Sequence, residues 1–140
     1  MKIYFAASIR GGRQDQEKYH DLIRFLSLKV EVLTEHVGDS LIGKTGENEL
    51  KNQEIHSRDL RWLESADGVV AEVSTPSLGV GYEIGIAEKL AKPTLCLFDA
   101  SRKEHRLSAM ISGNPQFRTF YYHDLDQAKE EIVSFIDSLS

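Results

Sequence analysis

One turn of the sequence combines residue types that suit chemistry beside a bound anion. Residues 76–85 read PSLGVGYEIG, and they separate an apolar run at 68–73 from a stretch of helical character. Where a parallel strand empties into the start of a helix, backbone N–H groups point at a site that an anion can occupy. Glu83 lies about one turn into this helix, and Gly81 and Gly85 on either side would let a ligand or another backbone approach closely. The turn indicates a carboxylate next to an anion site, as chemistry on a phosphorylated molecule would need.

Two further loops follow expected strands and carry polar side chains. The first, residues 8–13, reads SIRGGR and offers a hydroxyl, two guanidinium groups and two glycines ahead of a helix. This combination suits a phosphate, although the loop taken alone reads equally well as a solvated glycine turn before a helix. The second loop, residues 34–37, reads TEHV. Three loops that converge at one sheet edge favour a shared ligand site over coincidence.

The elements that must position these loops follow from the periodicity of apolar residues. Short β-rich runs alternate with amphipathic stretches, in which apolar residues recur at helical spacing. We expect strands at 2–7, 30–33, 68–73, 93–98 and 117–122, and helices at 14–28, about 48–65, 79–90 and 125–139. Alternation with crossovers of roughly a dozen residues or more predicts an α/β fold, a doubly wound five-stranded parallel sheet of the Rossmann or flavodoxin type. Ligands of such sheets bind beyond the carboxyl ends of the strands, where strand order reverses.

Length and charge narrow the classes of function. The 140 residues predict a single domain over 1–140, because a chain of this length buries roughly two thirds of its unfolded surface. A net charge of -5 with no basic cluster argues against a nucleic-acid partner, so any nucleotide bound should be a single small one. Cys96, the only cysteine, lies in an apolar strand and supports neither a disulfide nor a thiolate metal site. The first residues are expected to form a strand, which argues against a cleavable leader. The apolar runs are well short of the ~18 residues that a membrane span needs, so we expect no membrane partner and a cytoplasmic protein.

A second motif points to a different chemistry. Residues 38–45, GDSLIGKT, satisfy the phosphate-loop pattern of nucleoside triphosphatases and lie between an expected strand and an expected helix. Gly46 follows where the helix of that motif should already run, and the strand at 68–73 carries Glu72 where a magnesium-binding aspartate is usual. We therefore interpret this segment as a flap over the pocket.

Six ordered blocks of the sequence resemble the 2′-deoxynucleoside 5′-monophosphate N-glycosidases, which are relatives of the nucleoside 2-deoxyribosyltransferases. The resemblance runs from Lys2 to about Tyr122. It rests on Tyr4-Phe5 with 8–13, on 33–37, on His56 with 59–60 and 62–63, on 66–67 with 69–73, on 76–85 and on 106–111. It departs at 38–52, where the family varies in length and lacks the lysine-threonine loop, and at Ala7, where glycine is common. These departures bear on base preference more than on reaction type.

The resemblance implies hydrolysis of the N-glycosidic bond of a deoxynucleoside monophosphate to free base and 2-deoxyribose 5-phosphate, without a metal or cofactor. Rupture of this bond builds positive charge on C1′ and the ring oxygen, so a carboxylate on that face captures the carbon or stabilises the cation. The resemblance gives this role to Glu83, with Tyr4 as the phenol that positions it. The departing base needs a proton or a hydrogen bond, for which Asp59 is the candidate, and Asp59 could also orient the sugar hydroxyl.

The resemblance also implies a homodimer whose subunits share their sites. The residues expected to bind the substrate and its 5′-phosphate are Ser8, Ile9, Arg10, Gly11, Gly12, Arg13, His36, Ser77, Gly79, Ser108 and Met110. Ser108 would reach in from the partner subunit with Met110 beside it. Ile9 would pack against the base or sugar, and His36 would approach the base from the side.

Several of these residues could instead have a purely structural role. Asp59 would otherwise be a solvated helix charge, Tyr4 a core aromatic and Met110 a gap filler. Ser108 would cap a short helix, and Glu72 would be structural or a partner behind the pocket.

Alternative functions also stay open. A nucleoside 2-deoxyribosyltransferase uses the same glutamate but would be expected to lack a phosphate cradle. A ribonucleotide N-glycosidase acting on CMP or hydroxymethyl-CMP would share the architecture. A nucleotide-binding sensor module without turnover is permitted because a fold does not determine a function.

Overall fold

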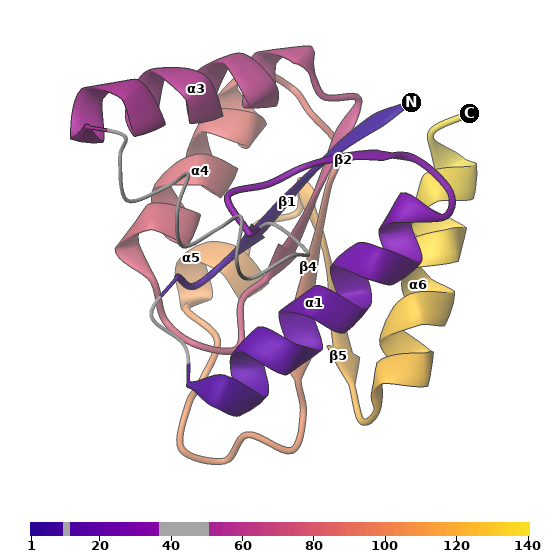
Figure 1. Ribbon diagram of the computed structural model, residues 1–140. Helices are drawn as coiled ribbons and strands as arrows, with labels where there is room; N and C mark the ends of the chain where they lie inside the picture. Colours follow the sequence, from indigo (N-terminus) through magenta and orange to yellow (C-terminus); the bar gives the residue numbers. More distant parts are fainter. Residues whose placement is uncertain (10–11, 37–50) are drawn as a thin grey trace.

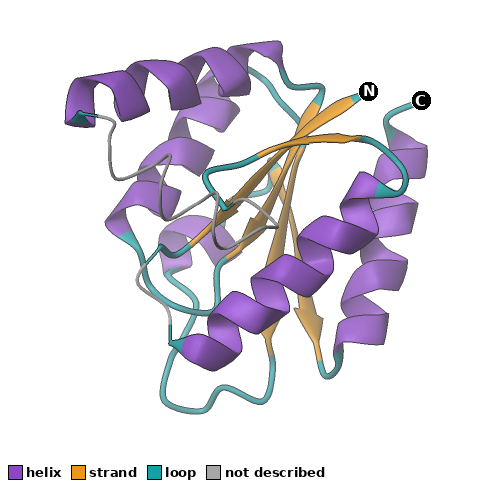
Figure 2. Cartoon of the chain, in the orientation of Figure 1, coloured by secondary structure: helices purple, strands orange, loops and turns teal. Residues whose placement is uncertain are grey.

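A sheet with the strand order β2-β1-β3-β4-β5 organises the described part of the chain, and every neighbouring pair is parallel. The computed structural model describes residues 1–9, 12–36 and 51–140, except the side chain of Arg13. Figures 1 and 2 show its elements, which are β1 (Lys2–Ala7), α1 (Arg13–Ser27), β2 (Glu31–Leu33), α3 (Asn52–Ser65), β3 (Gly68–Glu72), α4 (Leu78–Lys89), β4 (Thr94–Asp99), α5 (Ala109–Ser112), β5 (Phe117–Tyr122) and α6 (Leu125–Ser138). The predicted five-stranded, doubly wound α/β fold is confirmed.

Helices cover both faces of this sheet. α1 and α6 pack together on one face, while α3 and α4 pack on the other (Figure 1). Because β1 lies between β2 and β3, the chain leaves β1 toward α1 on one face and leaves β3 toward α4 on the opposite face. Strand order therefore reverses at β1, and a crevice is expected beyond the carboxyl ends of β1 and β3.

The alternation of side chains along β1 decides which residues can face that crevice. Ile3, Phe5 and Ala7 belong to the hydrophobic core on the side of α1 and α6. Tyr4 and Ala6 belong to the core on the side of α3 and α4. Successive side chains of a strand point to opposite faces, so the tyrosine expected in the site points toward α3 and α4.

The structure moves several element ends by a few residues and adds one short helix. β2 begins at Glu31, and α3 begins at Asn52 rather than near residue 48. Helix α5 is the short helix that the structural reading of Ser108 anticipates, although its four residues are too few to display a helical period. The Oγ atom of Ser108 accepts a hydrogen bond from the backbone N–H of Met110 at 3.2 Å, which is the cap that the structural reading of this serine predicts.

Two further expectations concern chemistry away from the site. Cys96 is fully buried in β4, and burial raises the pKa of its thiol to about 12, so it behaves as a small core residue. Among the helices that the structure describes, none combines the length and apolarity needed to cross a membrane.

Candidate active site

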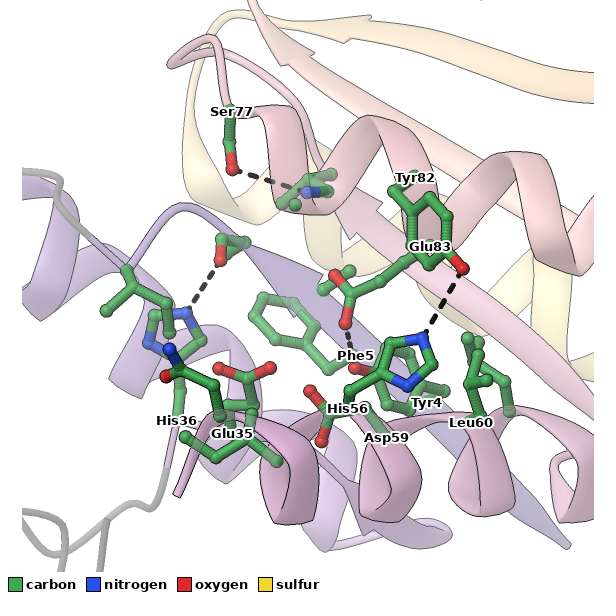
Figure 3. Close-up of a pocket in the computed structure, with 18 residues that line it drawn as sticks. Tyr4, Phe5, Glu35, His36, His56, Asp59, Leu60, Ser77, Tyr82 and Glu83 are labelled. Atoms are coloured by element: carbon green, nitrogen blue, oxygen red, sulfur yellow. Dashed lines mark hydrogen bonds between the residues drawn. The ribbon is translucent and has the colours of Figure 1, made fainter. Parts of the chain in front are cut away.

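A cavity of about 250 Å³ lies in the crevice that the strand order predicts. Its walls come from β1, from the residues that follow β2, from α3 and from the first turns of α4 (Figure 3). Beside apolar side chains such as Ile9 and Leu60, its lining includes three carboxylates and two tyrosines, namely Glu35, Asp59, Glu83, Tyr4 and Tyr82. The cavity is therefore a place for a cationic centre beside a flat ring.

Glu83 is held by Tyr4 from across the cavity. The Tyr4 hydroxyl, on a side chain that is 1% exposed, donates a hydrogen bond to Oε2 of Glu83. Burial raises the pKa of Glu83 to about 7, and the negative charge of Glu35 acts in the same direction, while the hydrogen bond from Tyr4 opposes it. Burial and the neighbouring Glu83 raise the pKa of Tyr4 far above its ordinary value, so the phenol stays a proton donor. The arrangement fixes one carboxylate oxygen and leaves the other for a ligand.

Asp59 is a buried carboxylate and not a solvated helix charge. It is 6% exposed and accepts a hydrogen bond at 3.0 Å from Nε of Arg58, its neighbour on α3. The Arg58 guanidinium in turn stacks on the ring of Trp62, one helical turn further on, at 4.4 Å from the ring centre. The helix thus supplies both the carboxylate and a cation that offsets its charge.

Three carboxylates converge on the middle of the cavity. Glu35, Asp59 and Glu83 each place a carboxylate oxygen within 4.8 Å of the other two (Figure 3). These residues are the described side chains close enough together to share a cation. Where these carboxylates are ionised, their charges favour a positively charged group in the same small volume.

His36 closes the cavity on the side of β2. Its ring is 7% exposed, and Nε2 lies 2.9 Å from the carbonyl oxygen of Ala7, so Nε2 carries the proton and Nδ1 is the acceptor. The ring also packs edge-on against Tyr19 at 5.2 Å. Burial lowers the pKa of His36, so the imidazole is neutral near pH 7 and can accept as well as donate.

Ser77 begins the helix that carries Glu83. Its Oγ atom accepts a hydrogen bond from the backbone N–H of Val80 at 3.2 Å and so caps α4. Ser77 and Gly79 border the cavity at this helix start, where the helix dipole and the first N–H groups favour an anion. An anion and the Glu83 carboxylate are thereby placed about one helical turn apart.

Comparison with known proteins identifies the family to which this constellation belongs. The sequence pattern of the nucleoside 2-deoxyribosyltransferases matches residues 3–127. The chain belongs to this family. Among its relatives, the 5-hydroxymethyl-dUMP N-hydrolase of Tetraodon nigroviridis is 49% identical over 134 residues, which are 95% of this chain and 94% of the relative. The enzyme of the same name from Mus musculus is 47% identical over 135 residues, 96% of this chain and 76% of the relative.

Solved structures agree on the fold of the family. The CMP N-glycosidase of Clostridium botulinum superimposes with a TM-score of 0.70 at 19% identity, over 96% of this chain and 99% of that one. At this identity the likeness supports the shared architecture alone.

The structure gathers half of the residues that the family resemblance assigned to the site in one cavity. The cavity brings together Tyr4, Ile9, His36, Asp59, Ser77, Gly79 and Glu83. Ser8 is buried just beyond β1, and Gly12 flanks the first turn of α1. Arg10, Gly11, the side chain of Arg13 and the phosphate-loop-like segment 38–45 lie outside the described residues.

Ser108 and Met110 lie away from this cavity. They line a separate groove of about 700 Å³ with Leu78 and with one face of α4. Gly81 and Gly85 also border this groove, although they flank Glu83 in the sequence. A Cβ atom on either glycine would meet no atom of the described residues within 4 Å.

Three residues of the cavity were not assigned a role from the sequence. Glu35 precedes His36 in the loop after β2, and this position in the sequence was the one sign that Glu35 could reach the site. His56 lies one turn before Asp59 on α3, and its Nε2 atom is 3.4 Å from the hydroxyl of Tyr82 on α4. The His56–Tyr82 contact joins the two helices at the cavity, a pairing between distant segments that spacing within one helix does not reveal.

Glu72 takes the structural role that the sequence left open. It is completely buried and does not line the cavity. Its carboxylate accepts hydrogen bonds from the backbone N–H and the hydroxyl of Ser74 at 2.8 and 3.0 Å. Tyr122 donates to the same carboxylate. The glutamate at the end of β3 therefore fixes the turn that leads to α4.

Proposed function

We propose that this protein hydrolyses the N-glycosidic bond of 2′-deoxynucleoside 5′-monophosphates, giving a free nucleobase and 2-deoxyribose 5-phosphate. The observation that carries the proposal is the Glu83 carboxylate, held by Tyr4 in a small cavity with Asp59 opposite. Relatives close to half identical over nearly the whole chain are named as N-hydrolases of one such nucleotide, which supports the same reaction class.

Glu83 is proposed to act on the sugar. As the bond to the base lengthens, C1′ and the ring oxygen become positive, and an ionised carboxylate on that face attacks C1′ or stabilises the cation. The free oxygen of Glu83 does this while the Tyr4 hydroxyl holds the other. Carboxylates about 5 Å apart are typical of glycosidases in which one attacks the sugar directly, and the 4.8 Å limit here is of that order. Water then releases the sugar phosphate.

Asp59 is proposed to assist the departing base. Its side chain faces Glu83 across the cavity, where it can hydrogen-bond the base or the sugar hydroxyl as the bond breaks. Arg58 keeps this carboxylate in place from the same helix. His36, with a neutral ring, is positioned to meet polar atoms of the base, and Ile9 offers an apolar contact beside it.

The 5′-phosphate is proposed to bind between the starts of α1 and α4. Ser77 and Gly79 supply the α4 side, and Ser8 and Gly12 belong to the connection that leads into α1. Arg10, Gly11 and Arg13 complete the proposed cradle by sequence position. Loss of these contacts should raise KM, whereas loss of Glu83 should lower kcat, because only the latter acts chiefly on the transition state.

A homodimer is proposed to complete the site. Leu78 is 96% exposed and Met110 is 82% exposed, and both border the groove beside Gly81 and Gly85. A second copy of the chain would cover these apolar side chains and would bring Ser108 toward the phosphate of its partner.

The test is base release by the purified protein and by Glu83→Ala from deoxynucleoside monophosphates, ribonucleoside monophosphates and unphosphorylated deoxynucleosides. We expect release confined to the deoxynucleotides and a loss of activity of several orders of magnitude in the variant. Activity on unphosphorylated nucleosides that needs an added acceptor base would instead identify a transferase. Release only from CMP-like ribonucleotides would favour the ribonucleotide N-glycosidase, and binding without release would favour the sensor.

A further inference from the structure

A closed triangle of side chains lies outside the cavity and joins three connections of the fold. We call it the Asp15 clamp, made of Asp15, Thr75 and Arg102. The Thr75 hydroxyl donates to Oδ2 of Asp15 at 2.7 Å and accepts from Nη1 of Arg102 at 3.2 Å. The Nη2 atom of Arg102 donates to Oδ1 of Asp15 and closes the triangle. Each polar group is thus satisfied by the other two.

The clamp lies between the two helix starts proposed to hold the phosphate. Asp15 is in the first turn of α1, which Gly12 flanks, and Thr75 stands two residues before Ser77, the cap of α4. Arg102 comes from the connection that follows β4. In Figure 1 the start of α1 and the connections after β3 and β4 meet at the same end of the sheet. A change in the clamp would therefore change the spacing of the two helix starts.

The neighbouring residue of the same connection is fixed independently. The backbone N–H and the hydroxyl of Ser74 both donate hydrogen bonds to the carboxylate of the buried Glu72. The Oγ atom of Ser74 also accepts a hydrogen bond from the backbone N–H of Asp99 at 2.7 Å. Ser74 is therefore tied to the sheet, whereas Thr75 is tied to α1. This division means that loss of the Thr75 hydroxyl should loosen the connection toward α1 without releasing it from the sheet.

Charge gives the clamp a second effect on an anionic ligand. Asp15 is 6% exposed, so its negative charge lies in a poorly solvated place near the start of α1. Arg102 pairs directly with that carboxylate and offsets its repulsion of a phosphate. An unpaired aspartate at this place would weaken anion binding.

We infer that the Asp15 clamp sets the affinity of this enzyme for the 5′-phosphate of its substrate by fixing the starts of α1 and α4 relative to each other. The inference rests on the proposed function. Asp15, Thr75 and Arg102 are positioning residues, since none of them lines the cavity, although Thr75 also borders the groove beside α4. A ligand that needs both helix starts at one spacing loses affinity when that spacing is no longer held.

The deciding variants are Thr75→Val and Thr75→Ser. Valine keeps the volume of threonine and removes the hydroxyl, while the pair between Asp15 and Arg102 stays intact; serine keeps the hydroxyl. Thr75→Val removes both hydrogen bonds of the hydroxyl, and we expect it to raise KM for a deoxynucleoside monophosphate roughly 3- to 10-fold, with kcat within about twofold. Inhibition by inorganic phosphate should weaken in parallel, and Thr75→Ser should retain the wild-type KM.

Thr119→Val provides the matched control. The Oγ1 atom of Thr119 on β5 is buried and has no hydrogen-bond partner among the described residues, so its removal should leave KM unchanged. Melting curves of all variants show whether each is folded at the assay temperature.

Each outcome decides the inference. An unchanged KM in Thr75→Val, or an equal rise in Thr75→Ser, overturns it while the proposed hydrolysis stands. If the wild-type protein releases no base, calorimetric titration with the same nucleotide separates the two ideas: weaker binding by Thr75→Val supports the clamp although hydrolysis fails. If the wild-type protein does not bind the nucleotide at all, both the function and the clamp are wrong.

Discussion

At the scale of single residues, the Tyr4 hydroxyl is the group with most control over Glu83. Its hydrogen bond opposes the effect of burial on the pKa of that carboxylate. We expect Tyr4→Phe to lower kcat about 10- to 100-fold, because a hydrogen bond to a charged group is worth roughly 1.5–3 kcal/mol. The acidic limb of the pH–rate profile should also move to higher pH. Tyr121→Phe, at an exposed tyrosine of β5, is the control and should change neither.

The raised pKa of Glu83 also predicts how stability depends on pH. The folded pKa is about 7 and the ordinary value is 4.5, so between these values the folded protein binds more protons than the unfolded chain. Its free energy of unfolding should therefore fall as the pH rises from about 4.5 to about 7. Glu83→Gln removes this contribution and still accepts a hydrogen bond from Tyr4, so the variant should melt above the wild type at pH 8 and closer to it at pH 5. Equal melting temperatures of the variant and the wild type at both pH values would show that the pKa of Glu83 is not raised.

At the scale of elements, replacing the N-caps of α4 and α6 distinguishes an effect on folding stability from an effect on substrate binding. Ser77 and Asp124 each accept a hydrogen bond from the first turn of their helix, at 3.2 and 2.9 Å. Replacing either by alanine should cost about 1 kcal/mol of unfolding free energy. Only Ser77→Ala should also raise KM, because α4 begins at the proposed phosphate site and α6 lies on the other face of the sheet. Thermal melting and steady-state kinetics on both variants check this; a matching KM in the two variants would remove Ser77 from the phosphate site.

At the scale of the whole molecule, the groove beside α4 predicts association of two copies. The molar mass in solution should be twice the 15.8 kDa of the chain. Leu78→Asp places a charge at the most exposed large apolar side chain among the described residues and should shift the protein toward the monomer, with a loss of activity if Ser108 acts in the partner's site. Leu28→Asp, at an 85% exposed leucine on the end of α1, is the control and should leave the mass unchanged. Light scattering after size exclusion distinguishes the two states, and a wild-type mass of one chain would contradict the dimer.

The sequence was sufficient for the fold because the alternation of strands and amphipathic helices extends over the whole chain. Parallel strands need long crossovers, and right-handed crossovers place helices on both faces. The same reasoning located the site, since ligand residues of such a sheet follow the strands on either side of the point where strand order reverses. The spacing of apolar residues did not predict helix α5, because four residues show no period, and Ser108 as a possible cap was its only signal.

Within the site, the sequence by itself determined the residue types and the sheet edge at which they gather: Glu83 after β3, Tyr4 on β1, and His36 after β2. The resemblance had implied the bond between Tyr4 and Glu83, which the structure contains, whereas only the tertiary structure decided the third carboxylate from Glu35 and the bridge from Asp15 to Thr75. The physical reason is that the periodicity of apolar residues is a property of neighbours in the sequence and can be seen without knowing the fold. A contact between residues 60 or 79 positions apart depends instead on how whole elements pack, which one chain's spacing does not encode.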